Sequence, residues 1–153
     1  MPRFQGTEEQ EPALSAYIKL LRAGNSIAAE VTAGLSKAGL TPTQFAVLEA
    51  LHHASESGTM CLSEVAQKIL TGSGNLTLVF NNLEKRGLAR RKPPGRDRRY
   101  VGLEITALGA KLMAEIFPPH VGAIVDAMRR LTPEEQEQLA ALCRKLGLGT
   151  EKQ

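Results

Sequence analysis

The stretch from Leu62 to Leu88, LSEVAQKILTGSGNLTLVFNNLEKRGL, decides the fold class of this chain. Its first part carries apolar residues at the i, i+3, i+4, i+7 spacing of an amphipathic helix, namely Leu62, Val65, Ala66 and Ile69. The same spacing returns in a second stripe made of Leu76, Val79, Phe80 and Leu83. The segment Thr71-Gly72-Ser73 between the stripes is typical of a tight turn, and Gly87 ends the second helix. Two short helices joined by such a turn predict a helix-turn-helix.

The residues that follow Gly87 change from a helical to an alternating pattern. Residues 88–92 fit one strand, and Val101, Leu103 and Ile105 alternate as a second strand. The intervening segment, Pro93 to Asp97, contains two prolines and a glycine and therefore predicts a turn. We expect a β-hairpin that forms a wing beside the helix-turn-helix.

Positive charge is concentrated on this hairpin and on the end of the preceding helix. Residues 84–100 contain eight basic and two acidic side chains, although the whole chain of 153 residues has a net charge of only +3. A charge run is most often a solvated face. A long arginine-rich run on an otherwise slightly acidic chain instead favours a surface that binds the phosphates of nucleic acid.

Helices are predicted on both sides of this region. Residues 11–37 have a helical apolar pattern, and Thr41 with Gln44 forms a capping box for a helix that reaches His53. Thr106 caps a further helix that we expect Pro118-Pro119 to kink or break. A last helix runs from a capping box at 132–135 to residue 147. The prediction is a mostly α chain with a small β-hairpin (α+β), with a winged helix-turn-helix at 41–105 and helical dimerisation regions at 11–40 and 106–148.

The outward face of the second helix of the helix-turn-helix is polar but mostly uncharged. Amides and hydroxyls suit the reading of base edges, since an asparagine can pair with adenine N6 and N7, and an exposed leucine suits a thymine methyl. The arginines of the wing suit the minor groove. The predicted DNA-binding residues are Ser73, Asn75, Thr77, Leu78, Asn81, Asn82, Arg96, Asp97, Arg98 and Arg99. Asp97 would repel phosphate, so we expect it to hold a neighbouring arginine in place.

Several of these segments together resemble the MarR family of regulators. The resemblance is carried by residues 62–66, by 76–88, by Asp97-Arg98-Arg99, by the pattern Ile105-Thr-x-x-Gly109 and by the segment at 131–135. It covers residues 11–148. It implies a homodimer with two winged domains on a palindromic DNA operator, and a repressor released by a small ligand or by thiol oxidation. It also places 73–82 on the recognition helix, Asp97 and Arg99 in the wing, and Ser63-Glu64 at the start of the preceding helix.

The dimer is expected from the residues as well, because the terminal helices carry apolar stripes outside the small winged domain and need a partner to bury them. Other classes find no support in the sequence. There is no recognisable catalytic arrangement, no phosphate-binding glycine motif and no set of metal ligands, so we expect neither an enzyme nor a cofactor or metal. Widely spaced cysteines, an acidic N-terminus and the lack of long apolar runs predict a cytoplasmic protein without a membrane span.

Two triggers stay open at this point. The first is a small phenolic ligand between the dimerisation helices and the winged domain, with candidate contacts Tyr17, His52, His53, Phe117 and His120. The second is a redox switch at Cys61, which precedes a helix whose dipole lowers a thiol pKa. Cys143 is expected in the apolar core. A winged-helix module that binds protein instead of DNA is a further alternative.

Overall fold

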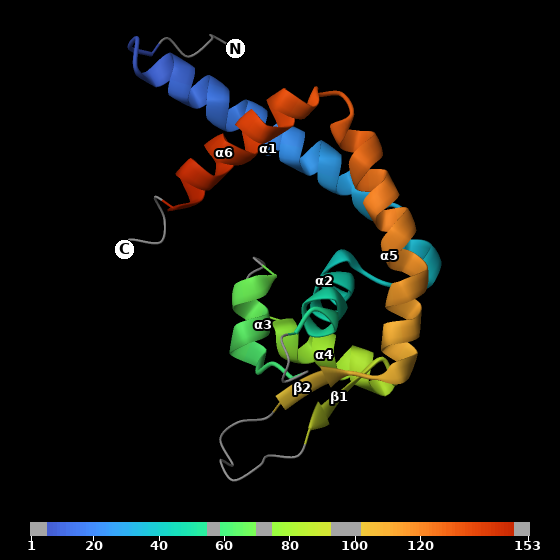
Figure 1. The fold of residues 1–153 in the computed structure, drawn as a ribbon. Helices are drawn as coiled ribbons and strands as arrows, with labels where there is room; N and C mark the ends of the chain where they lie inside the picture. The colour runs from blue at the N-terminus through green and yellow to red at the C-terminus, as the bar shows by residue number, and fades with distance from the viewer. Residues whose placement is uncertain (1–5, 55–58, 70–74, 93–101, 149–153) are drawn as a thin grey trace. The chain divides into compact units, whose positions relative to one another are not determined.

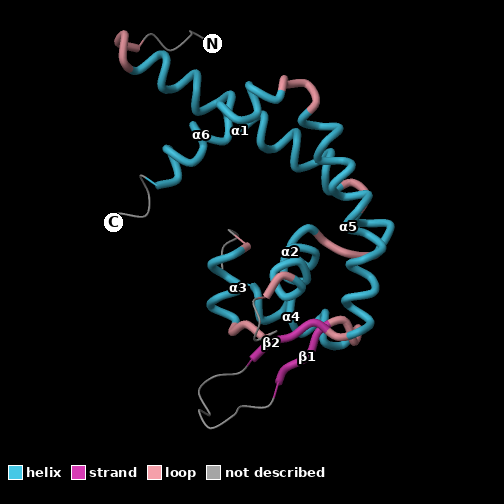
Figure 2. The backbone as a smooth tube through the Cα atoms, in the orientation of Figure 1, coloured by secondary structure: helices cyan, strands magenta, loops and turns pink. Residues whose placement is uncertain are grey.

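The computed structural model describes residues 6–54, 59–69, 75–92 and 102–148 of the chain (Figure 1). Its elements, in order, are α1 (Gln10–Thr32), the 3-10 helix η1 (Leu35–Ala38), α2 (Pro42–His52), α3 (Leu62–Lys68), α4 (Leu76–Lys85), β1 (Ala89–Lys92), β2 (Gly102–Ile105), α5 (Ala107–Met128) and α6 (Pro133–Leu148). The predicted fold class, mostly helical with one β-hairpin, is confirmed (Figure 2). The chain divides into two compact units, Thr32–His120 and the combination of Met1–Val31 with Val121–Gln153.

The unit Thr32–His120 is built on a core to which α2, α3, α4, the hairpin and the first part of α5 all contribute. The largest fully buried side chains in it are Phe80, Leu48, Leu51, Leu83, Met113, Val47 and Val65. The predicted stripe of α4 accounts for its share, since Leu76, Phe80 and Leu83 are buried. Burial of each such side chain contributes roughly 1.5–3 kcal/mol. The inward stripe also determines which face of α4 remains outside.

The ends of the helices in this unit follow the signals in the sequence. Thr41 and Gln44 form the predicted capping box, with the Thr41 N–H donating to Gln44 Oε1 at 3.0 Å and the Gln44 N–H donating to Thr41 Oγ1 at 3.2 Å. Gly87 has a φ of +69°, and it ends α4 in a Schellman motif. In that motif the Leu88 N–H donates to the Leu83 carbonyl at 3.0 Å. The motif turns the chain directly from α4 into β1.

The wing is an antiparallel hairpin with a third, short partner. Ala89 pairs with Ile105 and Lys92 pairs with Gly102. Met60, which precedes α3, forms an isolated antiparallel bridge with Leu103, with hydrogen bonds of 3.0 and 2.7 Å. The sequence analysis missed this bridge, because one residue has no alternating pattern to reveal it. The bridge attaches the start of α3 to the base of the wing.

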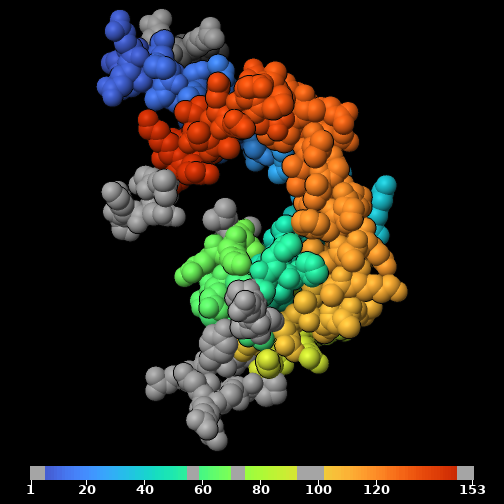
Figure 3. All heavy atoms as spheres, viewed as in Figure 1, coloured from blue at the N-terminus to red at the C-terminus, as the bar shows by residue number. Residues whose placement is uncertain are grey.

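The other unit consists of α1, α6 and the last part of α5. Arg130, just after α5, donates to both carboxylate oxygens of Glu30 in α1, at 3.2 and 3.0 Å. The capping box predicted at 132–135 is present, with the Thr132 N–H donating to Glu135 Oε2 at 2.8 Å. Large apolar side chains are nevertheless exposed on all three helices, namely Leu14, Tyr17, Leu20, Leu21, Val121, Ile124, Val125, Leu142 and Leu146. Figure 3 draws the heavy atoms of the chain as spheres, with α1 in blue and α6 in red.

Two local expectations were wrong, and a third was wrong in part. Pro118 and Pro119 lie inside α5, so the helix does not break there, which was one of the two outcomes expected of them. On either side of the pair, Phe117 packs against the ring of His53, the C-cap of α2, and His120 packs against Phe45 within α2, so tertiary contacts favour the helix on both sides of the prolines. The predicted helix 11–37 is divided, since α1 ends at Thr32 and η1 follows. Cys143 is exposed on α6 instead of lying in a core.

Candidate nucleic-acid interface

The outward face of α4 carries the side chains that the sequence analysis selected. Asn75 at the N-cap, Thr77 and Asn82 are exposed, and Leu78 is 53 % exposed. Leu78 does not pack into the core, so it presents an apolar group among polar neighbours. Together these residues form a surface that we call the α4 face: Asn75, Thr77, Leu78, Asn81 and Asn82. It presents uncharged donors and acceptors beside one apolar contact, which is the chemistry suited to base edges.

Asn81 differs from the rest of the α4 face because it is half-buried and has a charged partner. The Arg91 guanidinium, from β1, donates from Nη2 to Asn81 Oδ1 at 2.7 Å. The carbonyl oxygen of this side chain is therefore engaged inside the protein. The bidentate pairing with adenine that we expected for an asparagine here needs that oxygen as well as the amide nitrogen.

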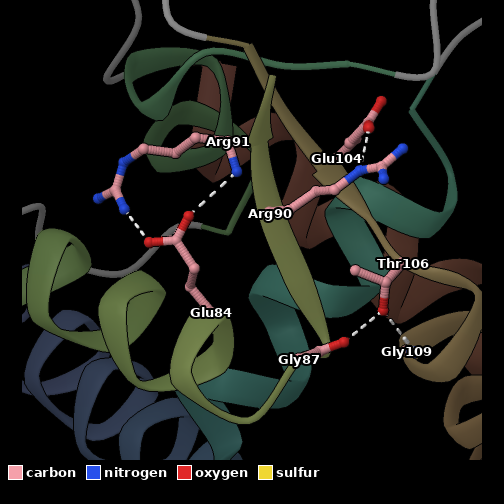
Figure 4. Close-up of polar contacts among 7 residues, drawn as sticks. All are labelled: Glu84, Gly87, Arg90, Arg91, Glu104, Thr106 and Gly109. Carbon is pink, nitrogen blue, oxygen red and sulfur yellow. Dashed lines mark hydrogen bonds and ion pairs between the residues drawn. The ribbon is translucent and has the colours of Figure 1, made fainter. Parts of the chain in front are cut away.

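Arg91 is held by more than Asn81. Its Nη1 donates to Glu84 Oε2, and its backbone N–H donates to Glu84 Oε1 at 3.2 Å (Figure 4). The guanidinium carbon also lies 5.0 Å from the centre of the Phe80 ring, within the range of a cation–π contact. A planar guanidinium held by a carboxylate and by a ring has little rotational freedom left. These contacts join the second helix of the helix-turn-helix to the first strand of the wing.

The arginines of the described basic cluster have partners within the protein, although they are exposed like the lysines beside them. Arg90 Nε lies 2.5 Å from Glu104 Oε1, its cross-strand neighbour (Figure 4). Arg86 donates from Nη1 to the Gly39 carbonyl at 2.8 Å, which ties the end of α4 to the turn after η1. Lys85 and Lys92 are exposed. The sequence analysis treated all these bases as one phosphate-binding surface, whereas Arg86, Arg90 and Arg91 have partners within the protein.

Half of the predicted DNA contacts lie outside the described residues. They are Ser73, in the turn before α4, and Arg96, Asp97, Arg98 and Arg99, in the segment between β1 and β2. Their roles stay predictions. The described residues that flank the segment between β1 and β2, Lys92 and Gly102, pair with each other across the hairpin.

The junction between the wing and α5 depends on Thr106 and Gly109. Thr106 Oγ1 donates to the Gly87 carbonyl at 2.6 Å and accepts from the Gly109 N–H at 3.1 Å (Figure 4). The Thr106 N–H donates to the Leu88 carbonyl at 3.1 Å. Thr106 therefore caps α5, as expected, and also fixes the turn at the end of α4.

Four of the five candidate ligand contacts lie in the unit Thr32–His120, and three of them, His53, Phe117 and His120, make ring contacts that join α5 to α2 and its C-cap. The rings of His53 and Phe117 have centroids 5.7 Å apart, and those of His120 and Phe45 are 4.4 Å apart. Phe45 was taken only for a core residue. His120 Nδ1 is buried and has no hydrogen-bond partner among the described residues. His52 is exposed and contacts only the His53 ring among the aromatic contacts described.

A pocket of about 290 Å³ adjoins this aromatic cluster. It lies between α2 and α3 and is lined by Ala46, Glu49, Ala50, His53, Lys68 and Ile69. His53 takes part in both features. Tyr17, the remaining candidate, is 60 % exposed on α1 in the other unit.

Cys61 occupies the N-cap of α3 and is half-buried. Its N–H donates to Glu64 Oε2 at 2.6 Å, and its Sγ lies 2.9 Å from Ser63 Oγ. The thiol hypothesis stays a prediction. No group of three or more His, Cys, Asp or Glu side chains among the described residues could hold a metal ion, and no helix in the described ranges is long and apolar enough to cross a membrane.

Comparison with known proteins identifies the family. The family model for the MarR family matches residues 38–99. The chain is 38 % identical over 138 residues to the HTH-type transcriptional regulator MhqR of Bacillus subtilis, covering 90 % of this chain and 93 % of that protein.

Two solved structures share the fold as well. Sco3205 of Streptomyces coelicolor, a MarR family transcriptional regulator solved in complex with DNA, is 25 % identical with a TM-score of 0.82, covering 97 % of this chain and 91 % of that one. BpsR of Bordetella bronchiseptica, described in terms of regulation of DNA binding by 6-hydroxynicotinic acid, is 26 % identical with a TM-score of 0.76, covering 95 % and 98 %. These relatives are regulators rather than enzymes, as expected for this chain. The protein belongs to the MarR family of transcriptional regulators.

Proposed function

We propose that this protein is a sequence-specific DNA-binding repressor that binds a palindromic operator as a homodimer and releases it when a small phenolic ligand binds. The observation that carries the proposal is the α4 face, an uncharged polar surface with exposed Leu78 at its centre. Such a surface on the second helix of a helix-turn-helix fits the major groove. The DNA complex of Sco3205 supports the same use of the fold.

DNA binding is tested by gel shift with DNA from upstream of the protein's own gene, across a series of salt concentrations. A repressor that neutralises phosphates loses affinity steeply as salt rises. Arg99→Ala should weaken binding to all sequences and reduce the salt slope by about 1, because it removes one phosphate contact. Failure to shift any DNA at low salt would favour the protein-binding module over the repressor.

The homodimer is supported by the apolar side chains left exposed on α1, α5 and α6. Soluble monomers rarely expose large contiguous apolar patches, so these helices fit a second copy of the chain. The sedimentation of the purified protein tests this, with Leu142→Glu as the disruptive variant and Lys145→Glu as a control at a polar position of the same helix. A monomer of the unmodified chain at micromolar concentration would refute the dimer.

A ligand site is supported by the aromatic cluster of Phe45, His53, Phe117 and His120 and by the adjoining pocket. The buried Nδ1 of His120 needs a partner, and a phenol hydroxyl supplies one. The hydroxylated aromatic acid that regulates BpsR is of the same chemical kind.

A thermal-shift screen of phenolic acids tests the ligand. We expect His120→Leu to abolish a ligand-induced shift that the matched change His52→Leu preserves, because His120 offers a buried, unpartnered Nδ1 whereas His52 is exposed. The ligand should also lower DNA affinity. The screen includes the variant Cys61→Ser. If no phenolic acid affects the unmodified protein and Cys61→Ser loses regulation, the trigger is oxidation of the Cys61 thiol and not a phenolic ligand.

A further inference from the structure

Asn81 and Arg91 together suggest how one operator position is chosen. We propose that Arg91 orients the Asn81 carboxamide so that only its amide nitrogen faces the DNA, as a hydrogen-bond donor. Arg91 is then a positioning residue, and Asn81 selects bases that present an acceptor. This inference rests on the proposed function, because it assumes that the α4 face reads DNA.

The orientation of Asn81 follows from the contacts of the guanidinium. Glu84 accepts from both the backbone N–H and Nη1 of Arg91, and the guanidinium carbon lies over the Phe80 ring. The remaining Nη2 points at Asn81 Oδ1, at 2.7 Å. A charge-assisted hydrogen bond of this length is stronger than one between neutral groups, so the carbonyl end of the amide stays turned toward β1.

The chemical consequence concerns the bases that Asn81 can contact. A carboxamide is planar, so fixing Oδ1 on the protein side directs Nδ2 away from it. An asparagine that pairs with adenine on two points needs Oδ1 to accept from N6. With Oδ1 occupied, the Nδ2 donor can satisfy guanine O6 or N7, adenine N7 or thymine O4. The adenine preference expected of a free asparagine is thereby lost.

Binding selection from a randomised operator library tests this. Arg91→Lys keeps the positive charge, but an ammonium lacks the planar fork that reaches Glu84 and Asn81 together. The matched control is Arg90→Lys, in the same strand, whose partner is Glu104. We expect the unmodified protein to accept guanine, adenine or thymine about equally at one position in each half-site and to disfavour cytosine, which presents a donor there. Arg91→Lys should shift that position toward adenine by about tenfold, the size of one bidentate contact, and Arg90→Lys should not.

A measurement without DNA separates positioning from a structural role. In NMR spectra the side-chain amide of Asn81, identified by its loss in Asn81→Asp, should be as rigid as the backbone in the unmodified protein and mobile in Arg91→Lys. Equal mobility in both would overturn the inference even if both proteins fold and melt alike. Asn81→Ala should remove the base preference at the same position.

The outcomes separate a failure of the positioning role of Arg91 from a failure of the proposed function. If the unmodified protein selects an operator but Arg91→Lys leaves every base preference unchanged, the positioning role of Arg91 is refuted. The proposed function as a DNA-binding repressor is not affected by that result. If Asn81→Ala lowers the melting temperature and alters no preference, Asn81 only links β1 to α4, and the inference is again refuted. If the unmodified protein selects no sequence, the proposed function fails and this inference fails with it.

Discussion

Gly109 lies in the first turn of α5. Among the glycines described, it is predicted to be the one at which an added methyl group lowers the stability of the fold most. A Cβ built there would overlap the carbonyl oxygen of Leu88, lie 3.0 Å from its carbonyl carbon and lie 2.8 Å from Ile105 Cγ1. Ordinary van der Waals contacts begin at 3.4 Å. The obstructing atoms belong mainly to the backbone, which cannot move aside as a flexible side chain does.

The loss of folding free energy in Gly109→Ala is worked out from the atoms that the new methyl group displaces. Displacing the Leu88 carbonyl weakens the hydrogen bond that it accepts from the Thr106 N–H at 3.1 Å, which is worth about 1 kcal/mol. Overpacking adds about 1–3 kcal/mol, and the better helix propensity of alanine returns at most about 1 kcal/mol. The net loss, after the full propensity gain is subtracted, is about 1–3 kcal/mol, which lowers the Tm by roughly 2–12 °C for a chain of this size.

Thermal and urea denaturation of Gly109→Ala, followed by circular dichroism, measures this loss. The control is Gly122→Ala in the same helix, where nothing lies within 4 Å of the new Cβ. It should be neutral or stabilising by up to about 1 kcal/mol. If both variants have the same Tm as the unmodified protein, the prediction is refuted, since the backbone at Leu88 would then have room for a methyl group.

Three further predictions follow from the same unit. Thr106→Ala removes the α5 cap and the bond to the Gly87 carbonyl, so stability should fall by about 1–2 kcal/mol in urea, and Thr106→Ser should recover most of it. Arg86→Met loses the bonds to the turn at Gly39 and should cost about 1 kcal/mol, whereas Lys85→Met should be neutral; equal effects would show that only charge matters. Asn82→Ala should leave stability unchanged because the side chain is exposed, but should relax base preference at one operator position by roughly tenfold; uniform loss on all DNA would indicate a phosphate contact instead.

Local signals account for the parts that were predicted correctly. The two apolar stripes at 62–69 and 76–83, the capping boxes at 41–44 and 132–135 and the glycine at 87 act within one or two turns of chain. Their outcome therefore depended little on the rest of the molecule. The outward position of Leu78 followed in the same way, because the inward face of α4 was already assigned to Leu76, Phe80 and Leu83.

Contacts between distant segments decided what the sequence analysis missed. Nothing local shows that Met60 pairs with Leu103, or that Arg91 turns toward Asn81 and Glu84 while its neighbour Arg90 meets Glu104. Pro118-Pro119 was expected to kink or break a helix; α5 continues through the pair, with Phe117 and His120 packed against His53 and Phe45.

The amino-acid sequence by itself determined the elements, their ends and the polar face of α4, because spacing and capping are properties of neighbouring residues. Only the tertiary structure decided which charged and amide groups face each other, since such pairs depend on how β1 packs against α4. The sequence shows that an arginine is positively charged, but not what it pairs with. Whether it contacts phosphate or a carboxylate of the same chain depends on the residues that the fold places beside it.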